Sequence, residues 1–548
     1  MGASRAMVRT RPKIALQAVF YWLGLLLVLG LGGWHTWRFA AFTGEALVFR
    51  YPLDGLEGTL LSEARLLRAG EALYQPIRPD RFVSAPYQPL SYLALALAEQ
   101  VAYNGDAPPA DVIQGPIFLP GRVVSLACML GAGILIGIAG WRLTRSWITL
   151  PLALSLWLAF PPVTLWATRI KPDPLALCFT AVGMAVAASH VARWSGPTRV
   201  GVRSTEWRLM LAAFFFACAY FTKQTALAAP MAVGLTLVIQ SWMASGARTP
   251  GWKFVSAMRS PLIFGGSYLL LIGLAWAILE YVTGGQYTVH VLGMHRTEWW
   301  SFGLFRKYLN LLFFNWPLLI AGGMALVLCV YRRHGAASVP EHPGEALLTL
   351  PALYLLTALP GLLAAGAEGA HHNHLLEPYL ALVLAAVVLA TGRQPQARAM
   401  RTPGYGLAML LALALIIGQL WVLRERPPWY RSEFNLARQE RGRFINLIQS
   451  QPGEVLADDV ALLLAAGRPL RYDDPSTMGP AARIGIWNES NLLAEVSTQH
   501  FSLILLPFNA MERNQDPRGR WSPQFIAQLR VHYTLLYRDE IYAYVPVR

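Results

Sequence analysis

Two acidic residues, Asp54 and Glu57, lie among turn-forming residues in the stretch YPLDGLEG at 51–58. A long apolar run ends shortly before this stretch, and apolar residues recur at helical spacing from Thr59 onward. A carboxylate beside a bilayer costs free energy unless it is solvated, paired with a cation or needed for the protein's function. We therefore expect a loop at the start of a short amphipathic helix, with an acid placed to take a proton from a substrate. The alternative is a solvated loop with a helix cap.

Other polar residues of the kinds that bind phosphate or sugar stand in short stretches between apolar runs. The candidates are Arg169, Lys171, Asp173, Lys223, Gln224, Tyr287, His290, His295, Arg296, His371, His372 and His374. Motifs for other chemistries are missing, because the sequence has no GxSxG elbow, no HExxH and no Walker loop. A carboxylate beside several cations suits transfer from a phosphate-activated donor. The cations would bind the phosphate leaving group, and the carboxylate would deprotonate the attacking hydroxyl.

Plainer interpretations stand beside these. Arg169 and Lys171 can extend to lipid headgroups, and Asp173 can be a helix cap or the ion-pair partner of Arg169. The three histidines at 371, 372 and 374 leave a divalent-metal site open, although packing near headgroups or substrate explains them as well. We expect no cofactor. Lys223 has no long loop around it, which favours a contact with phosphate over a role as an anchor.

The composition places these residues in a membrane protein. The 548 residues are 55% hydrophobic and 14% charged, and the mean hydropathy is +0.39. Long apolar runs stop near residue 423, which predicts a polytopic helical protein followed by one soluble region. The net charge of +15 lies mostly in short loops, where it meets lipid, so we expect no nucleic-acid partner. All four cysteines lie in apolar runs and form no disulfide or metal motif.

Eleven apolar segments predict membrane spans. They lie near residues 14–33, 118–140, 148–165, 174–193, 206–221, 225–243, 261–281, 309–331, 347–366, 375–391 and 404–423. Arginine-rich loops alternate with loops that hold few cations, which predicts a cytoplasmic N-terminus. We take the first run as an uncleaved span and not as a signal peptide. Residues 89–103 are apolar but short, and we expect them to form an interfacial or re-entrant helix within a first outer loop at 34–117.

The residues after 423 have a different character, with short helical and extended patterns in alternation. Extended patterns fall at 454–457, 502–508, 533–537 and 541–545, and helical ones at 434–450, 460–466 and 523–529. This predicts a soluble α/β domain with a mixed sheet at 424–548, outside the cytoplasm. The paired acids Asp458-Asp459 and Asp473-Asp474 fall near expected strand ends, and we interpret them as solvated turns.

The motifs together resemble a known family. The first-loop pattern DGLEG…LY.P, which includes Tyr74, resembles the GT-C superfamily of polyprenyl-phosphate-sugar glycosyltransferases. So do Arg122, RIKPD at 169–173, TKQT at 222–225 and HHNHLLEPYLAL at 371–382. The chain is most similar to the bacterial branch related to protein mannosyltransferases and aminoarabinose transferases, glycosyltransferase family 39. The resemblance covers the membrane part, and the α/β tail also fits.

The resemblance implies a transferase in the bacterial inner membrane with its active site on the extracytoplasmic face. The donor would be a polyprenyl-phosphate-linked sugar, and the acceptor a hydroxyl on a glycan, lipid or protein. Residues 1–423 would form the catalytic domain. The family places an acid in the first loop as the base; Leu56 stands where an Asp is common, so we prefer Glu57, followed by Asp54. A lipid-linked sugar transporter or flippase and a non-catalytic glycan-binding scaffold are the rival functions.

Overall fold

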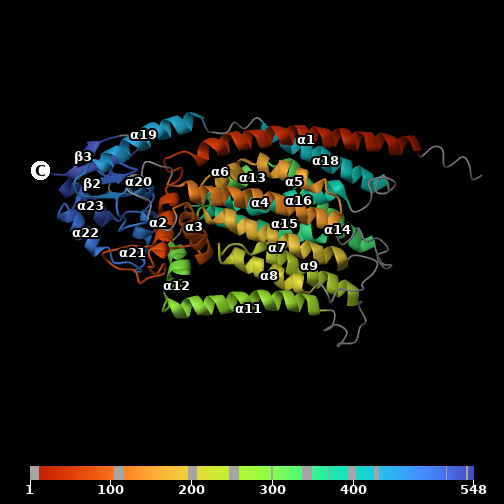
Figure 1. The fold of residues 1–548 in the computed structure, drawn as a ribbon, viewed down its shortest axis with the longest axis horizontal. Helices are drawn as coiled ribbons and strands as arrows, with labels where there is room; N and C mark the ends of the chain where they lie inside the picture. Colours follow the sequence, from red (N-terminus) through yellow and green to blue (C-terminus); the bar gives the residue numbers. More distant parts are fainter. Residues whose placement is uncertain are drawn as a thin grey trace, which may run out of the picture.

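The protein is a multi-pass helical membrane protein with a mixed β-sheet near its C-terminus (Figure 1). The structure, a computed structural model, describes residues 11–103, 117–194, 206–245, 258–297, 300–335, 348–367, 370–392, 403–424, 431–513, 515–538 and 541–547. The long helices run side by side in one bundle, with α1 (Arg11–Leu47) along one edge and α11 (Arg259–Val282) along the other (Figure 1).

Seven helical segments in the described residues are long and apolar enough to cross a membrane. They are Leu16–Leu47, Leu119–Thr144, Pro172–Ala192, Arg259–Val282, Thr349–Gly366, His372–Thr391 and Gly406–Arg424. They belong to α1, α4 (Leu119–Thr144), α7 (Pro172–Trp194), α11, α15 (Thr349–Ala358) with η6 (Leu359–Gly366), η7 (His372–Leu375) with α16 (Leu376–Thr391), and α18 (Pro403–Arg424). Two bent helix pairs raise the number to nine if each pair is one span.

The first bent pair is α5 (Thr149–Ala159) with α6 (Pro161–Ala167), which meet at 81°. Its break falls at Phe160, whose extended backbone precedes Pro161 and Pro162, and proline disfavours helix in the residue before it. The second pair is α13 (Phe302–Phe313) with α14 (Trp316–Gly335), bent by 83°. These bends bring helix ends toward the polar residues of the candidate site.

All eleven expected spans coincide with a helix or a helix pair, but two of them are short. The helices α8 (Trp207–Tyr220) and α9 (Ala228–Ser245) are apolar, yet neither meets the length and composition of a full span. At 1.5 Å per residue the 14 residues of α8 extend about 21 Å, less than the ~30 Å of a hydrocarbon core. Within the described ranges the structure therefore contains seven to nine candidate spans, fewer than the eleven expected.

The short apolar segment after the first span forms a helix that is too short to cross. This helix, α3 (Pro89–Ala102), packs against α2 (Leu56–Arg68) and α4. Its Glu99 is buried and bonds Arg65 of α2 through Nη2–Oε1 at 2.7 Å. The segment therefore forms a short helix packed on its neighbours, and its place in an outer loop stays a prediction.

The C-terminal region contains the predicted mixed sheet. Its strands are β1 (Glu454–Ala457), β2 (Phe501–Leu506), β3 (Tyr533–Tyr537) and β4 (Tyr542–Pro546), in the order β1-β2-β4-β3. β1 and β2 are parallel and the other pairs are antiparallel. The surrounding helices are α19 (Arg431–Gln449), α20 (Val460–Ala465), α21 (Pro475–Arg483), α22 (Ser490–Ser497) and α23 (Pro523–His532). The sequence patterns had indicated three of these five helices.

The sheet region lies directly against the first outer loop (Figure 1). Phe82 N–H donates to Arg471 O at 2.8 Å, and Asp473 N–H donates to Phe82 O at 3.2 Å. Helix α2 contacts α20 so closely that a Cβ on Gly58 would lie 2.4 Å from Ala461 Cα. This corrects the interpretation of Asp473 as part of a solvated turn: it is buried where loop and tail meet.

Candidate active site

Asp54 stands between two cations at the start of the first outer loop. Its Oδ1 accepts a bond from Lys171 Nζ at 2.8 Å and from Leu56 N–H at 3.0 Å, and its Oδ2 lies 3.7 Å from Arg169 Nη1. Burial would raise the pKa of this carboxyl, but Lys171 and Arg169 hold the pKa well below its usual range. The relative solvent exposure of the Asp54 side chain is 16%. Asp54 is therefore an anion that substrate can reach.

Glu57 is placed differently, because no part of its side chain is exposed. Arg122 binds both of its oxygens, with Nη2–Oε2 at 2.8 Å and Nε–Oε1 at 2.9 Å. Leu53 N–H donates to Oε2 at 2.7 Å, and Ile170 N–H donates to Oε1 at 3.1 Å. These four donors occupy both oxygens. The geometry favours a positioning role for Glu57 over the role of base that we expected for it.

Arg122 explains why the loop has this conformation. It follows Pro120 in the first turn of α4 and is fully buried. Its guanidinium also donates to Phe49 O at 2.5 Å and to Tyr51 O at 2.8 Å. Arg122 thus joins the segment after α1 to Glu57, and Glu57 in turn bonds the turn before α7. The sequence marked Arg122 only through the family resemblance and did not indicate its partner.

Asp173 and Lys223 form a second ion pair close to the first. Lys223 Nζ bonds Asp173 Oδ1, and Trp166 Nε1–H donates to Asp173 Oδ2 at 3.3 Å. The two charged side chains are 10% and 14% exposed. We had considered Arg169 as the partner of Asp173; its partner is Lys223, and Arg169 faces Asp54. Lys223 therefore sits in a polar group of mixed charge.

The histidines at positions 371, 372 and 374 lie around these ion pairs. The ring of Trp166 is 6.4 Å from the ring of His371 and 6.1 Å from that of His372. Burial, together with the nearby charge of Lys171, lowers the pKa of His371, so this side chain is neutral at neutral pH. His374 lies within electrostatic range of both Lys223 and Asp173. Among the described residues, no three His, Cys, Asp or Glu side chains form a group that could hold a metal ion.

A second polar group contains the remaining candidates. Gln224 Nε2 is 2.7 Å from His295 Nε2, and the His290 ring lies between the carbonyls of Ser84 and Gln75, each at 2.8 Å. Tyr74 is buried, and its hydroxyl donates to Tyr87 O at 2.8 Å while its ring packs against the ring of Tyr287. These contacts tie the first outer loop to residues 286–295, which is a structural role for Tyr74 and His290. The side chain of Arg296 lies outside the described part of the chain.

The tail supplies two acids that the sequence analysis had assigned to a solvated turn, and the structure corrects this. Asp458 bonds Arg520 Nη1 and Trp521 Nε1, both at 2.9 Å. Asp459 caps α20, accepting from Ala461 N–H at 3.1 Å, and lies over Gly55 of the first outer loop. No local sequence pattern places residue 459 beside residue 55, because the contact depends on the docking of the tail.

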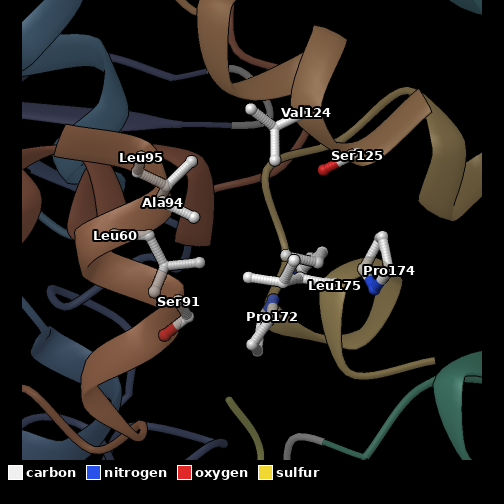
Figure 2. Close-up of a pocket in the computed structure, with 10 residues that line it drawn as sticks. Leu60, Ser91, Ala94, Leu95, Val124, Ser125, Pro172, Pro174 and Leu175 are labelled. Carbon is white, nitrogen blue, oxygen red and sulfur yellow. The ribbon is translucent and has the colours of Figure 1, made fainter. Parts of the chain in front are cut away.

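Two largely apolar cavities open beside the polar cluster. The first has about 290 Å³ of empty space, open solvent included, and Lys171 is part of its wall. Figure 2 shows its other lining residues: Leu60, Ser91, Ala94, Leu95, Val124, Ser125, Pro172, Pro174 and Leu175. The second has about 340 Å³ and includes His372 among lining residues from α5–α6, α13–α14, η7 and α18. A cationic group beside an apolar hollow suits a molecule with an anionic head and a hydrocarbon chain.

No protein-family model matches the sequence, and no curated protein matches it in sequence. Solved structures do match. ArnT from Cupriavidus metallidurans bound to undecaprenyl phosphate aligns with a TM-score of 0.51 and 12% identity, over 97% of this chain and 98% of that one. The apo oligosaccharyltransferase of Archaeoglobus fulgidus aligns with a TM-score of 0.46 and 10% identity, over 90% of this chain and 69% of that one. At such identity the likeness to ArnT concerns the fold alone, and this chain shares that fold over nearly its whole length.

Proposed function

We propose that the protein is a membrane glycosyltransferase that moves a sugar from a polyprenyl-phosphate donor to an acceptor hydroxyl on the extracytoplasmic face. The observation that carries the proposal is the carboxylate of Asp54, reachable and held by Lys171 and Arg169 beside an apolar cavity. The shared fold with ArnT, whose structure holds undecaprenyl phosphate, supports this choice of donor.

The donor would bind with its phosphate at the cations and its chain in apolar space. Lys171 and Arg169 reach the same carboxylate, so a phosphate placed there would meet both. Lys223 and the neutral His371 would add donors from the far side of the cluster. The first carbon units of the chain would enter at the apolar cavity in Figure 2, which has Lys171 in its wall and would have to widen to hold them. Membrane lipid would surround the rest of the donor's hydrocarbon chain.

The transfer would be a direct displacement with Asp54 as the base. The acceptor oxygen forms a bond to the anomeric carbon while its proton passes to Asp54. The bond from that carbon to the phosphate oxygen breaks, and the phosphate leaves with the electron pair, stabilised by Lys171 and Arg169. Before the donor binds, these cations depress the basicity of Asp54. A bound phosphate would share them, and this raises the pKa of Asp54 toward a useful range.

Glu57 would serve this reaction indirectly. Its ion pair with Arg122, and its bond from Ile170 N–H, hold Asp54 and the residues of the Arg169 turn in one place. The acceptor hydroxyl could belong to a glycan, a lipid or a protein. We assign residues 1–423 to the catalytic membrane domain and residues 424–548 to an extracytoplasmic domain. The cytoplasmic N-terminus and the bacterial inner membrane complete the proposal.

The experiment uses the full chain in detergent with a panel of undecaprenyl-phosphate pentoses and hexoses. Octyl glucoside serves as a hydroxyl acceptor, and release of undecaprenyl phosphate and formation of the glycosylated product are measured together. We expect at least one donor to yield both products in equal amounts. Failure of every donor, with no binding of undecaprenyl phosphate in native mass spectrometry, would overturn the proposal. Movement of intact donor across liposomes without product would identify a transporter instead.

A further inference from the structure

The soluble tail reaches the loop that holds Asp54 from two sides. Helix α20 packs on α2, with Gly58 against Ala461. Helix α19 passes the other end of the loop, where a Cβ on Gly442 would lie 2.9 Å from the hydroxyl of Tyr51. Gly58 permits a backbone approach that a side chain would prevent, and Gly442 leaves room for the Tyr51 hydroxyl. The tail is therefore part of the wall around the candidate active site.

The tail also brings an acidic side chain, Asp459, close to this loop. A Cβ on Gly55, the residue after Asp54, would lie 3.4 Å from Asp459 Oδ1. That oxygen accepts the cap bond from Ala461 N–H at 3.1 Å. No side chain or backbone group in the described ranges donates to the second oxygen, Oδ2. The cap bond occupies one oxygen of the carboxylate, and the carboxylate lies within electrostatic range of Asp54.

The charges around Asp459 come from three directions. Asp54 faces it from the first outer loop, Arg441 from α19, and Asp458 from its own turn. Asp458 is itself held by Arg520 and Trp521. Burial raises the pKa of Asp459 to about 6, Asp458 and Asp54 act in the same direction, and Arg441 opposes them. Asp54 has the opposite environment, with its pKa held well below the usual range.

Two neighbouring carboxylates with such different basicities can pass a proton in one direction. Resting on the function proposed above, the geometry points to Asp459 as the residue that receives the acceptor's proton from Asp54. The proton leaves the acceptor hydroxyl for Asp54, passes to the Asp459 carboxylate, and is released to water. No oxidation or reduction occurs, and Asp54 returns to its anionic state while the phosphate still occupies Lys171 and Arg169.

The test measures turnover of the donor that is active in the panel above, with octyl glucoside, as a function of pH. The wild-type rate should rise with pH through an inflection near pH 6, because Asp459 must be ionised to receive the proton. Asp459→Asn should remove that inflection and lower the plateau rate by ~10–100-fold. Binding of undecaprenyl phosphate should stay unchanged, since Lys171 and Arg169 pair with Asp54 and not with Asp459.

The substitution by asparagine keeps the cap, since asparagine and aspartate are equally good at this position. Asp80→Asn is the control, because Asp80 is an exposed acid that pairs with Arg78. It should keep the wild-type profile. Asp459→Ser, which also preserves a cap, provides a second variant if the first unfolds.

An Asp459→Asn or Asp459→Ser variant with the wild-type rate and inflection would overturn this inference. So would a wild-type profile without an inflection near pH 6. If Asp54→Asn is inactive while the Asp459 variants behave as wild type, the relay fails and the proposed function stands. If the wild-type chain turns over no donor, the proposed function fails and the inference fails with it.

Discussion

Arg122 and Glu57 form an ion pair that is fully buried, with Nη2–Oε2 at 2.8 Å and Nε–Oε1 at 2.9 Å. Neither side chain has any exposed surface. Such a pair stabilises a fold mainly because each charge would be costly without the other. In this protein the pair connects the first outer loop to α4, and it leaves Asp54 as the acid that faces the cations.

Removing the charge of Glu57 should therefore harm stability more directly than chemistry. Glu57→Gln leaves the Arg122 guanidinium buried without its counter-ion, which typically costs about 3–5 kcal/mol. Thermal unfolding in detergent measures the loss. Glu71→Gln is the control, because Glu71 bonds Arg81 at the exposed surface, where a pair contributes about 0–1 kcal/mol. A Glu57→Gln protein of wild-type stability whose transfer falls ~100-fold would restore Glu57 as the base.

Asp54→Asn should show the opposite pattern, with the fold kept and the reaction lost. Loss of a general base costs ~10²–10⁴-fold in rate. Binding of undecaprenyl phosphate should be kept or strengthened, because Lys171 and Arg169 no longer share their charge with a carboxylate. Transfer and lipid binding are measured side by side. Asp80→Asn, which changes an exposed acid of the same loop paired with Arg78, should match the wild type. Undiminished transfer by Asp54→Asn would remove Asp54 from the mechanism.

Lys223 can be tested for a role beyond its pairing with Asp173. Lys223→Met should weaken undecaprenyl phosphate binding by roughly 10–100-fold, since a hydrogen bond to a charged group contributes about 1.5–3 kcal/mol. The double variant with Asp173→Asn separates the two roles, because it removes the unpaired carboxylate. If Lys223 contacts phosphate, the double variant regains stability but not affinity. Recovery of wild-type affinity in the double variant would reduce Lys223 to a partner of Asp173.

Glu63 should make the docking of the tail depend on pH. It is fully buried and accepts bonds from Ser84 Oγ at 2.9 Å and from Ala85 N–H at 2.6 Å, while Ser84 N–H donates to Asp473 at 3.0 Å. Burial raises the pKa of Glu63 from 4.5 to about 8, and Asp474 adds to the effect. Between these values the folded state binds more protons than the unfolded state. The free energy of unfolding should therefore fall as the pH rises from about 4.5 to about 8.

Thermal unfolding at pH 5, 7 and 9 checks this direction. Glu63→Gln mimics the protonated form, so it should flatten the dependence and stabilise the protein at pH 9 relative to the wild type. Glu71→Gln should leave the dependence unchanged. A wild-type protein whose unfolding temperature rises steadily from pH 5 to pH 9 would contradict the account.

The orientation in the membrane predicts which surface positions a reagent can reach. In a background without the four native cysteines, Ser450→Cys after α19 should react with an impermeant maleimide in intact cells. Ser146→Cys, in the turn between α4 and α5, should react only after the membrane is opened. Equal or reversed labelling of the two positions would require the opposite topology or a different number of spans.

Features that depend on residues close together in the sequence were predictable. Hydrophobic runs located all eleven apolar helices or helix pairs, and alternation located the four strands of the tail. Run length alone overstated α8 and α9 as full spans, because the helices are shorter than their apolar segments. The polar residues between the apolar runs indicated the cluster that contains Asp54, Lys171 and Lys223.

Partnerships across the chain were not predictable. Asp173 pairs with Lys223 and not with the adjacent Arg169, since the turn before α7 directs the two side chains to different neighbours. Glu57 and Arg122 are 65 residues apart, and nothing in either local pattern indicates the other. Asp459 acquires its surroundings only when the tail docks on Gly55. Each of these depends on packing between elements and not on propensity.

Backbone hydrogen bonds join Phe82 to residues 471–473, so the first outer loop and the tail form one structural unit. Engineers who wish to change the specificity of such a protein often exchange its soluble domain for that of a relative. Here a foreign tail would meet Gly58 and Phe82 with the wrong surface and would leave both of them uncovered. A working hybrid would have to carry residues 51–92 together with its tail, so that the two segments are inherited as a pair.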